Sequence, residues 1–102
     1  MIFNYKKIKD LNQPYIIAEV GVNHNCSLKL AKKMIIQAKK GGANAVKFQT
    51  YKAEKIARID SAAYWDTSKE KTKSQYELFS RFDKFTHSDY KKLSIYCKKN
   101  YI

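Results

Sequence analysis

One pattern restricts the fold more than any other feature of the 102-residue sequence: two short apolar segments flank an amphipathic one between residues 15 and 49. Residues 15–20 form a continuous apolar, β-branched run, which is typical of a buried parallel strand. Ser27 is a suitable helix N-cap, and Gly41-Gly42 follows the segment as a helix stop. Residues recur at helical spacing between them: Leu28, Ala31, Ile35 and Ala38. With a second apolar run at 43–48, the order strand–helix–strand predicts parallel pairing and an α/β fold.

The remaining segments flank this unit. Residues 1–13 are polar with scattered apolar positions (Ile2, Phe3, Ile8, Leu11), and we expect a short edge hairpin or arm there. Residues 51–73 are mostly polar and irregular, which predicts a long connection of the kind that often has a function.

Two capping patterns then predict two helices. Ser74 with Glu77 and Thr86 with Asp89 each have the spacing of a capping box. The last helix should turn Tyr90, Leu93 and Cys97 inward and stop at Asn100. Residues 101–102 look like the start of a third strand.

Polar residues at the ends of the two predicted parallel strands are the candidates for chemistry. Alternate strand residues point to opposite faces, so Glu19 shares a face with Gly21, and Lys47 with Gln49. Ligands bind at the carboxyl ends of such strands. We expect this polar set to point to the inner, buried side of the sheet, where a carboxylate and an ammonium are costly unless they are paired or contact a ligand. Periodicity alone does not decide between a substrate site and a structural Glu19–Lys47 ion pair.

Other reactive side chains give weaker signals. His24 has no second ligand at metal-binding spacing, so a loop histidine bonded to the backbone is the better prediction. Cys26 precedes a helix N-terminus but lacks a His or Asp partner nearby, which argues against a catalytic cysteine. We expect Cys26 and Cys97 to be two free thiols. The pair Tyr64-Trp65 either stacks on a ligand or, as we favour, packs its loop onto the fold.

Composition narrows the possible partners. Lys and Arg outnumber Asp and Glu by 21 to 9, for a net charge of +12, and a basic chain raises the question of nucleic acid. However, the only arginines are Arg58 and Arg81, and Arg is the residue that contacts bases bidentately. The lysines fall where helices would face solvent, so a nucleic-acid-binding module is the weaker alternative. No run approaches the ~20 apolar residues of a membrane span, and the N-terminus lacks the order of a signal peptide, so we expect a cytoplasmic protein.

Two spaced motifs carry a family resemblance. Residues 16–25 (IIAEVGVNHN) and 42–50 (GANAVKFQT), followed by 63–66 (AYWD) and 73–79 (KSQYELF), closely resemble the N-acetylneuraminate (sialic acid) synthase family, which includes legionaminic and pseudaminic acid synthases. The resemblance implies that the chain is the opening strand–helix–strand–helix portion of a TIM (β/α)8 barrel. Since a complete barrel needs roughly 250 residues, residues 1–102 would be a partial N-terminal domain. The rest of the barrel and a C-terminal antifreeze-like domain would be absent.

The same resemblance implies a reaction and partners. Family members condense phosphoenolpyruvate with an N-acetylmannosamine-like sugar to give a nine-carbon acid and phosphate. They use a divalent metal, Mn²⁺ or Mg²⁺, and work as homodimers. Carried over by position, Glu19 contacts the sugar near its aldehyde, Lys47 meets phosphoenolpyruvate and Gln49 hydrogen-bonds the sugar. Glu19 and Lys47 are thus the expected catalytic residues, and no metal ligand is expected in this chain.

Two departures from the family pattern qualify this expectation. Cys26 stands where the family has Gly, which tolerates left-handed backbone that Cys does not, so the loop should be strained or reshaped. The chain is also far shorter than the family's enzymes, whose metal-binding histidines lie further along the barrel, so we expect no synthase activity from it alone because the metal site is missing. A non-catalytic truncated remnant is the main alternative, with the nucleic-acid module behind it.

Overall fold

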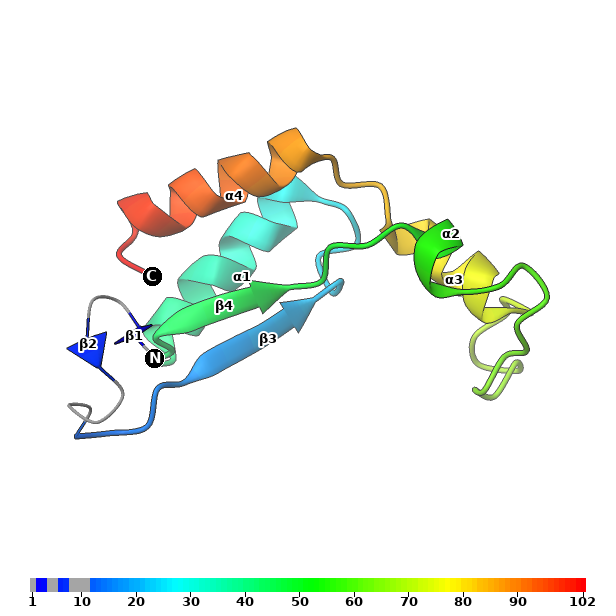
Figure 1. Ribbon diagram of the computed structural model, residues 1–102, viewed down its shortest axis with the longest axis horizontal. Coiled ribbons are helices and arrows are strands. Elements are labelled where there is room, and N and C mark those ends of the chain that lie inside the picture. The colour runs from blue at the N-terminus through cyan, green and yellow to red at the C-terminus, as the bar shows by residue number, and fades with distance from the viewer. Residues whose placement is uncertain (1, 4–5, 8–11) are drawn as a thin grey trace.

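The computed structural model describes residues 2–3, 6–7 and 12–102, and it has two small sheets and four helices in that part of the chain (Figure 1). In chain order the elements are β1 (Ile2–Phe3), β2 (Lys6–Lys7), β3 (Ile17–Gly21), α1 (Leu28–Lys40), β4 (Ala45–Phe48), α2 (Ala53–Ile56), α3 (Gln75–Phe82) and α4 (His87–Lys99). β1 and β2 pair antiparallel, which confirms the expected hairpin within 1–13. The apolar positions Ile8 and Leu11 lie outside the described residues.

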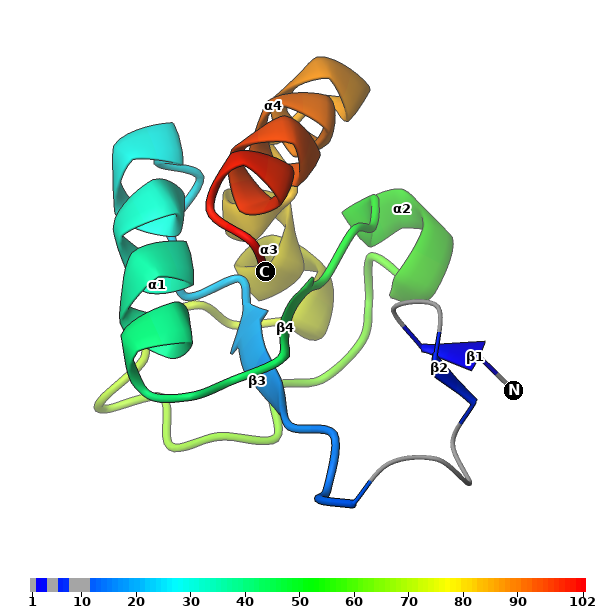
Figure 2. The same cartoon turned by 90° about the vertical axis from the view of Figure 1, so that its left-hand side faces the viewer.

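β3 and β4 form the parallel pair that the sequence predicts, with α1 as the crossover. Figures 1 and 2 show α1 and α4 side by side over one face of this pair. The fold class is therefore α/β. A two-stranded sheet is not a closed barrel, however, and membership in a TIM barrel stays a prediction. β3 begins at Ile17 rather than Tyr15, because Ile16 instead exchanges hydrogen bonds with the turn residue Asn44.

Helix α1 has the predicted boundaries for identifiable reasons. The Ser27 side chain accepts a hydrogen bond from the Leu30 N–H, which satisfies one of the unpaired donors of the first turn. Gly41 is the C-cap, and Gly42 follows with a left-handed φ of 87°. Ala31 and Ile35 are fully buried, and they form the core with Phe85 and Leu93 from the α4 side.

Helix α4 completes that core. A full capping box joins Thr86 and Asp89, as predicted, and Leu93 is buried while Tyr90 and Cys97 pack against the cluster. The helix ends at Asn100. The expected start of a third strand at 101–102 is wrong: Tyr101 adopts a left-handed turn, and Ile102 packs onto the core without strand pairing.

The long connection contains more structure than the sequence indicates. A short helix, α2, follows β4, and α2 lies beside α3 beyond the carboxyl end of β4 (Figure 1). Asp83, after α3, accepts a hydrogen bond from the Ala53 N–H of α2. The Ser74 cap is confirmed, but its reciprocal bond is not: the Glu77 carboxylate accepts from the Lys73 N–H instead. Within the described residues no helix is long and apolar enough to cross a membrane.

Candidate functional site

Glu19 and Lys47 lie opposite each other on the paired strands. The β3–β4 register places Glu19 beside Lys47, and the Lys47 Nζ forms an ion pair with Glu19 Oε2. Both side chains project from the sheet face that α1 and α4 leave uncovered, because Val46 and Phe48 take the helix side. Parallel strands thus bring together two opposite charges that are 28 residues apart in sequence.

Gln49 joins this pair through the backbone of Gly21. The Gln49 N–H donates to the Gly21 carbonyl at 3.2 Å, and a register shift between Glu19 and Gly21 bends β3 there. A β-carbon placed on Gly21 would lie 3.4 Å from Glu19 Oε1 and 3.6 Å from the Gln49 side-chain oxygen. Both polar side chains therefore lie over this glycine. We call Glu19, Lys47 and Gln49 the polar cluster.

The expectation that these charges are buried is wrong for this chain. The side chains of Glu19 and Lys47 are 50% and 59% exposed. An exposed pair of this kind contributes about 0–1 kcal/mol to stability. The ion pair forms, as the structural interpretation requires. Its contribution to stability is small, however, so stabilising the fold does not by itself explain the pair.

His24 lies behind the polar cluster, in the loop between β3 and α1. Its ring is fully buried, stacked on Phe85 with centroids 4.4 Å apart and tilted against Phe48 at 5.7 Å. The Nδ1 atom accepts a hydrogen bond from the Cys26 N–H at 3.1 Å, which confirms the backbone-bonded histidine. The other ring nitrogen, Nε2, is buried without a hydrogen bond of acceptable geometry.

Burial also favours the neutral form of the His24 imidazole. Removal from water lowers the pKa of the imidazole from its ordinary value, and the nearby Gly21 carbonyl opposes the shift without reversing it. Since Nδ1 is an acceptor, the neutral ring carries its proton on Nε2. The described residues contain no group of three His, Cys, Asp or Glu side chains that could hold a metal ion.

Cys26 occupies the backbone conformation that its position predicts. Asn25 and Cys26 have φ of 48° and 55°, both left-handed, where a β-carbon is disfavoured. The loop therefore keeps the path that a glycine would take and accepts the strain. Cys26 and Cys97 are both free thiols, as expected.

The two residues of the aromatic pair Tyr64–Trp65 differ in their surroundings. Trp65 is half-buried and its Nε1 donates to the Thr72 carbonyl, so this contact ties the loop to itself, and the favoured packing of the loop onto the fold stays a prediction. Tyr64 meets the Trp65 ring edge-on but is 74% exposed.

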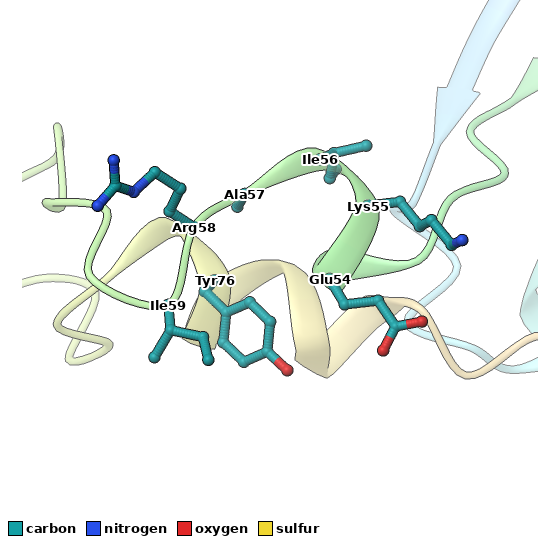
Figure 3. A pocket seen from close by; sticks show the side chains of 7 residues that line it. All are labelled: Glu54, Lys55, Ile56, Ala57, Arg58, Ile59 and Tyr76. Atoms are coloured by element: carbon teal, nitrogen blue, oxygen red, sulfur yellow. The ribbon is translucent and has the colours of Figure 1, made fainter.

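Two hollows lie near the α2–α3 pair. One of about 530 Å³ adjoins the polar cluster, with Lys47 and Gln49 on one wall and apolar side chains of β4, α2 and α3 on the others, among them Phe48, Ile56, Leu78, Phe79 and Phe82. The second, of about 590 Å³, lies between α2, the following turn and the start of α3. Figure 3 shows Lys55 and Arg58 extending from it in different directions, with Ile59 beside Tyr76. It shares no polar-cluster residue, so we assign only the first hollow to the site.

Sequence reasoning missed the residues that support the cluster from behind. The Tyr90 hydroxyl donates to the Gln49 carbonyl at 2.9 Å, although 41 residues separate them. Phe85 joins His24 to Tyr90 by stacking on one and meeting the other edge-on. No local pattern indicates these contacts; the only signal was the apolar spacing that turned Tyr90 toward the core.

The fold and the cluster define the class: an α/β protein with charged and amide side chains gathered at the carboxyl ends of parallel strands. The sequence model of the NeuB family matches residues 34–102, and the chain belongs to this family.

Known relatives agree. The N,N'-diacetyllegionaminic acid synthase of Legionella pneumophila is 42% identical over 71 residues, covering 68% of this chain and 20% of that protein. The enzyme of the same name from Campylobacter jejuni is 35% identical over 91 residues (87% and 27%). Human N-acetylneuraminate-9-phosphate synthase is 35% identical over 85 residues (83% and 24%). The chain thus spans between about a fifth and just over a quarter of the length of these relatives.

Proposed function

We propose that this chain supplies part of the substrate site of a synthase that condenses phosphoenolpyruvate with an N-acylated hexosamine, giving a nine-carbon sialic-type acid and phosphate. One observation supports this most: Glu19, Lys47 and Gln49 gather at the carboxyl ends of two parallel strands. Ligands of α/β proteins bind at that edge. The matched relatives are synthases of sialic-type acids.

The chemistry of each side chain fits a role in this reaction. Phosphoenolpyruvate is an anion, and the Lys47 ammonium offsets its charge. Because Lys47 contacts Glu19 Oε2, the second oxygen, Oε1, lies over Gly21 beside the Gln49 amide. A sugar hydroxyl can donate to that oxygen while the amide bonds a neighbouring group. Glu19 and Gln49 would hold the sugar with its aldehyde toward the enol carbon.

The reaction needs the two substrates to lie side by side, with the enol carbon facing the aldehyde carbon. The enol carbon of phosphoenolpyruvate forms a bond to the aldehyde carbon, water adds to the resulting cation, and the C–O bond to phosphate breaks. Holding both reactants in one site removes much of the entropic barrier. Lys47 and Glu19 contribute fixed charges that are set before the substrates arrive.

The barrel, the homodimer and the metal belong to this proposal for the complete enzyme. The described residues do not fit a metal site, since His24 Nδ1 is engaged and no ligand group gathers elsewhere among them. We therefore derive no step through Mn²⁺ or Mg²⁺, whose ligands would come from outside this chain.

A binding titration tests the role of Lys47. Phosphoenolpyruvate added to the isotopically labelled chain should shift the amide signals of Lys47, Gln49 and Gly21, and Lys47→Met should abolish these shifts. Lys29→Met, at an exposed position of α1, removes the same charge elsewhere and is the matched control. Equal binding by both variants would reject the site.

A turnover assay tests the role of the chain as a part. With Mn²⁺, phosphoenolpyruvate and N-acetylmannosamine, the 102-residue chain should release no phosphate above the no-enzyme rate. Steady phosphate release would contradict the proposal that further residues are needed.

A further inference from the structure

We propose that His24 is a positioning residue for the polar cluster: in its neutral form it holds the β3–α1 loop and the end of β4 in place, and its protonation releases them. The inference rests on the proposed function only in treating Lys47 and Gln49 as substrate-binding.

His24 contacts each segment that fixes the cluster. Its ring tilts against Phe48, the residue between Lys47 and Gln49, whose side chain faces the opposite side of β4. The ring also stacks on Phe85, which meets Tyr90 edge-on, and the Tyr90 hydroxyl donates to the Gln49 carbonyl. These contacts form a continuous path from His24, along the helix-covered side of β4, to Gln49.

A second path runs through the backbone of the loop. The Gly21 carbonyl, which affects the His24 ring, also accepts the Gln49 N–H, and Gly21 lies under Glu19 and Gln49. On the other side, His24 Nδ1 accepts the Cys26 N–H. This bond lies at the strained, left-handed turn of Asn25 and Cys26. Such a conformation persists only when surrounding contacts hold it.

Protonation reverses the bond at Nδ1. In the imidazolium both nitrogens are donors, so an N–H would face the Cys26 N–H and the loop would lose its acceptor. The charge would also lie in a fully buried position. Stacking over Phe85 can compensate part of this cost, since aromatic faces attract cations, but it cannot restore the acceptor.

Burial and the Gly21 backbone, not neighbouring charged side chains, determine the direction of the His24 pKa shift. Phe48 faces it from β4 and Phe85 from the segment before α4, neither of which titrates. Cys26 is the ionisable neighbour in its own loop, and Tyr90 lies behind Phe85. Glu19 and Lys47 project from the opposite face of the sheet. Among the described residues, no charged side chain is a cause of the His24 shift.

Nuclear magnetic resonance of the full chain tests this without a variant or a substrate. The chain has two histidines, His24 and the exposed His87. We expect the neutral His24 ring to carry its proton on Nε2 and its pKa to lie below the ordinary value of an imidazole, because the ring is buried. As His24 gains its proton, amide protection should fall at Cys26 and Gln49 while Leu93, in the core, stays protected. The inference would be overturned if the neutral ring carried its proton on Nδ1. It would also be overturned if the protection of the Gln49 amide did not change as His24 gained its proton. A parallel loss of protection at Leu93, which means global unfolding, would overturn it as well.

Two variants separate the acceptor from the ring. His24→Phe keeps an aromatic ring against Phe85 but removes the acceptor, and it should lower protection at Cys26 and Gln49 about fivefold, the effect of losing one hydrogen bond. His24→Asn offers an amide oxygen in place of Nδ1 and does not titrate. The protection of the Cys26 and Gln49 amides should therefore stay constant over the pH range in which His24 gains its proton. His87→Asn should change neither amide. If His24→Phe leaves both amides protected, the positioning role is wrong; if the amides respond but phosphoenolpyruvate does not bind, the proposed function fails and the positioning role stands.

Discussion

Gly21 is the position where backbone strain and the polar cluster can be tested together. Its φ of +57° is left-handed, and an L-residue there costs roughly 1–2 kcal/mol. The added β-carbon would make ordinary contacts at 3.4 Å and 3.6 Å rather than a clash. Replacing glycine also stiffens the unfolded chain, which returns about 0.4–1 kcal/mol. Gly21→Ala should therefore lower the free energy of unfolding by about 1 kcal/mol.

The helix stop supplies two matched controls. Gly42 has a φ of +87° and open space around its β-position, so Gly42→Ala should cost a similar amount through backbone strain alone. Its neighbour Gly41 has a φ of −75°, which alanine adopts readily. Gly41→Ala should therefore stabilise the chain by about 0.4–1 kcal/mol.

Urea unfolding measured by Trp65 fluorescence and by far-ultraviolet circular dichroism gives these values, and coincidence of the two curves tests two-state behaviour. With a urea slope of about 1–3 kcal/mol per molar, the Gly21→Ala midpoint should fall by roughly 0.3–1 M. Only Gly21→Ala should also shift the amide signals of Glu19 and Gln49. A Gly21→Ala chain as stable as wild type, or a Gly42→Ala chain more stable than Gly41→Ala, would refute the reasoning from φ.

Three further predictions follow from the structure. Leu93→Ala should lower the free energy of unfolding by about 2–5 kcal/mol, because it empties a fully buried site. Ile95→Ala on the same helix, at 47% exposure, should lower it by less than about 1 kcal/mol. Chemical unfolding measures both values, and equal losses would contradict the assigned core. Glu19→Gln should change stability by less than about 1 kcal/mol, because the ion pair is half exposed, yet it should alter the response of Gln49 to added sugar; a large loss of stability would favour the purely structural pair. Asp89 has its pKa lowered mainly by the backbone and hydroxyl of Thr86, so its contribution is present above the unfolded pKa and is lost as pH falls through the folded one. Thermal unfolding between pH 5 and pH 2 should thus lose part of its pH dependence in Asp89→Asn, and an unchanged profile would exclude the capping box as a cause.

The local elements followed from local chemistry. Ser27 and Thr86 accept the N–H groups that every helix start leaves unpaired, so capping residues could be recognised without tertiary structure. The apolar spacing of α1 and α4 likewise placed Ile35 and Leu93 in the core. The missed helix α2 has only four residues, too few for a periodic pattern. Its position depends instead on Asp83, at the C-terminal end of α3, which accepts a hydrogen bond from the Ala53 N–H.

The candidate site was predicted in part. Strand alternation put Glu19, Lys47 and Gln49 on a common face, and the parallel register fulfilled that prediction. Their exposure was not predicted, because burial depends on what covers a face and not on the strand itself. The resemblance also located the strained turn at Cys26, since a residue that replaces glycine must adopt the glycine's backbone angles.

The sequence by itself determined the order of strands and helices, the caps, the helix faces that become core and the family. Each of these depends on residues a few positions apart. Only the tertiary structure decided that Glu19 pairs with Lys47 on an exposed face, that Tyr90 holds the Gln49 carbonyl, and that His24 is buried behind them. The physical reason is distance along the chain: these contacts join groups up to 61 residues apart, as His24 and Phe85 are, and such pairs meet only once the helices have packed on the sheet.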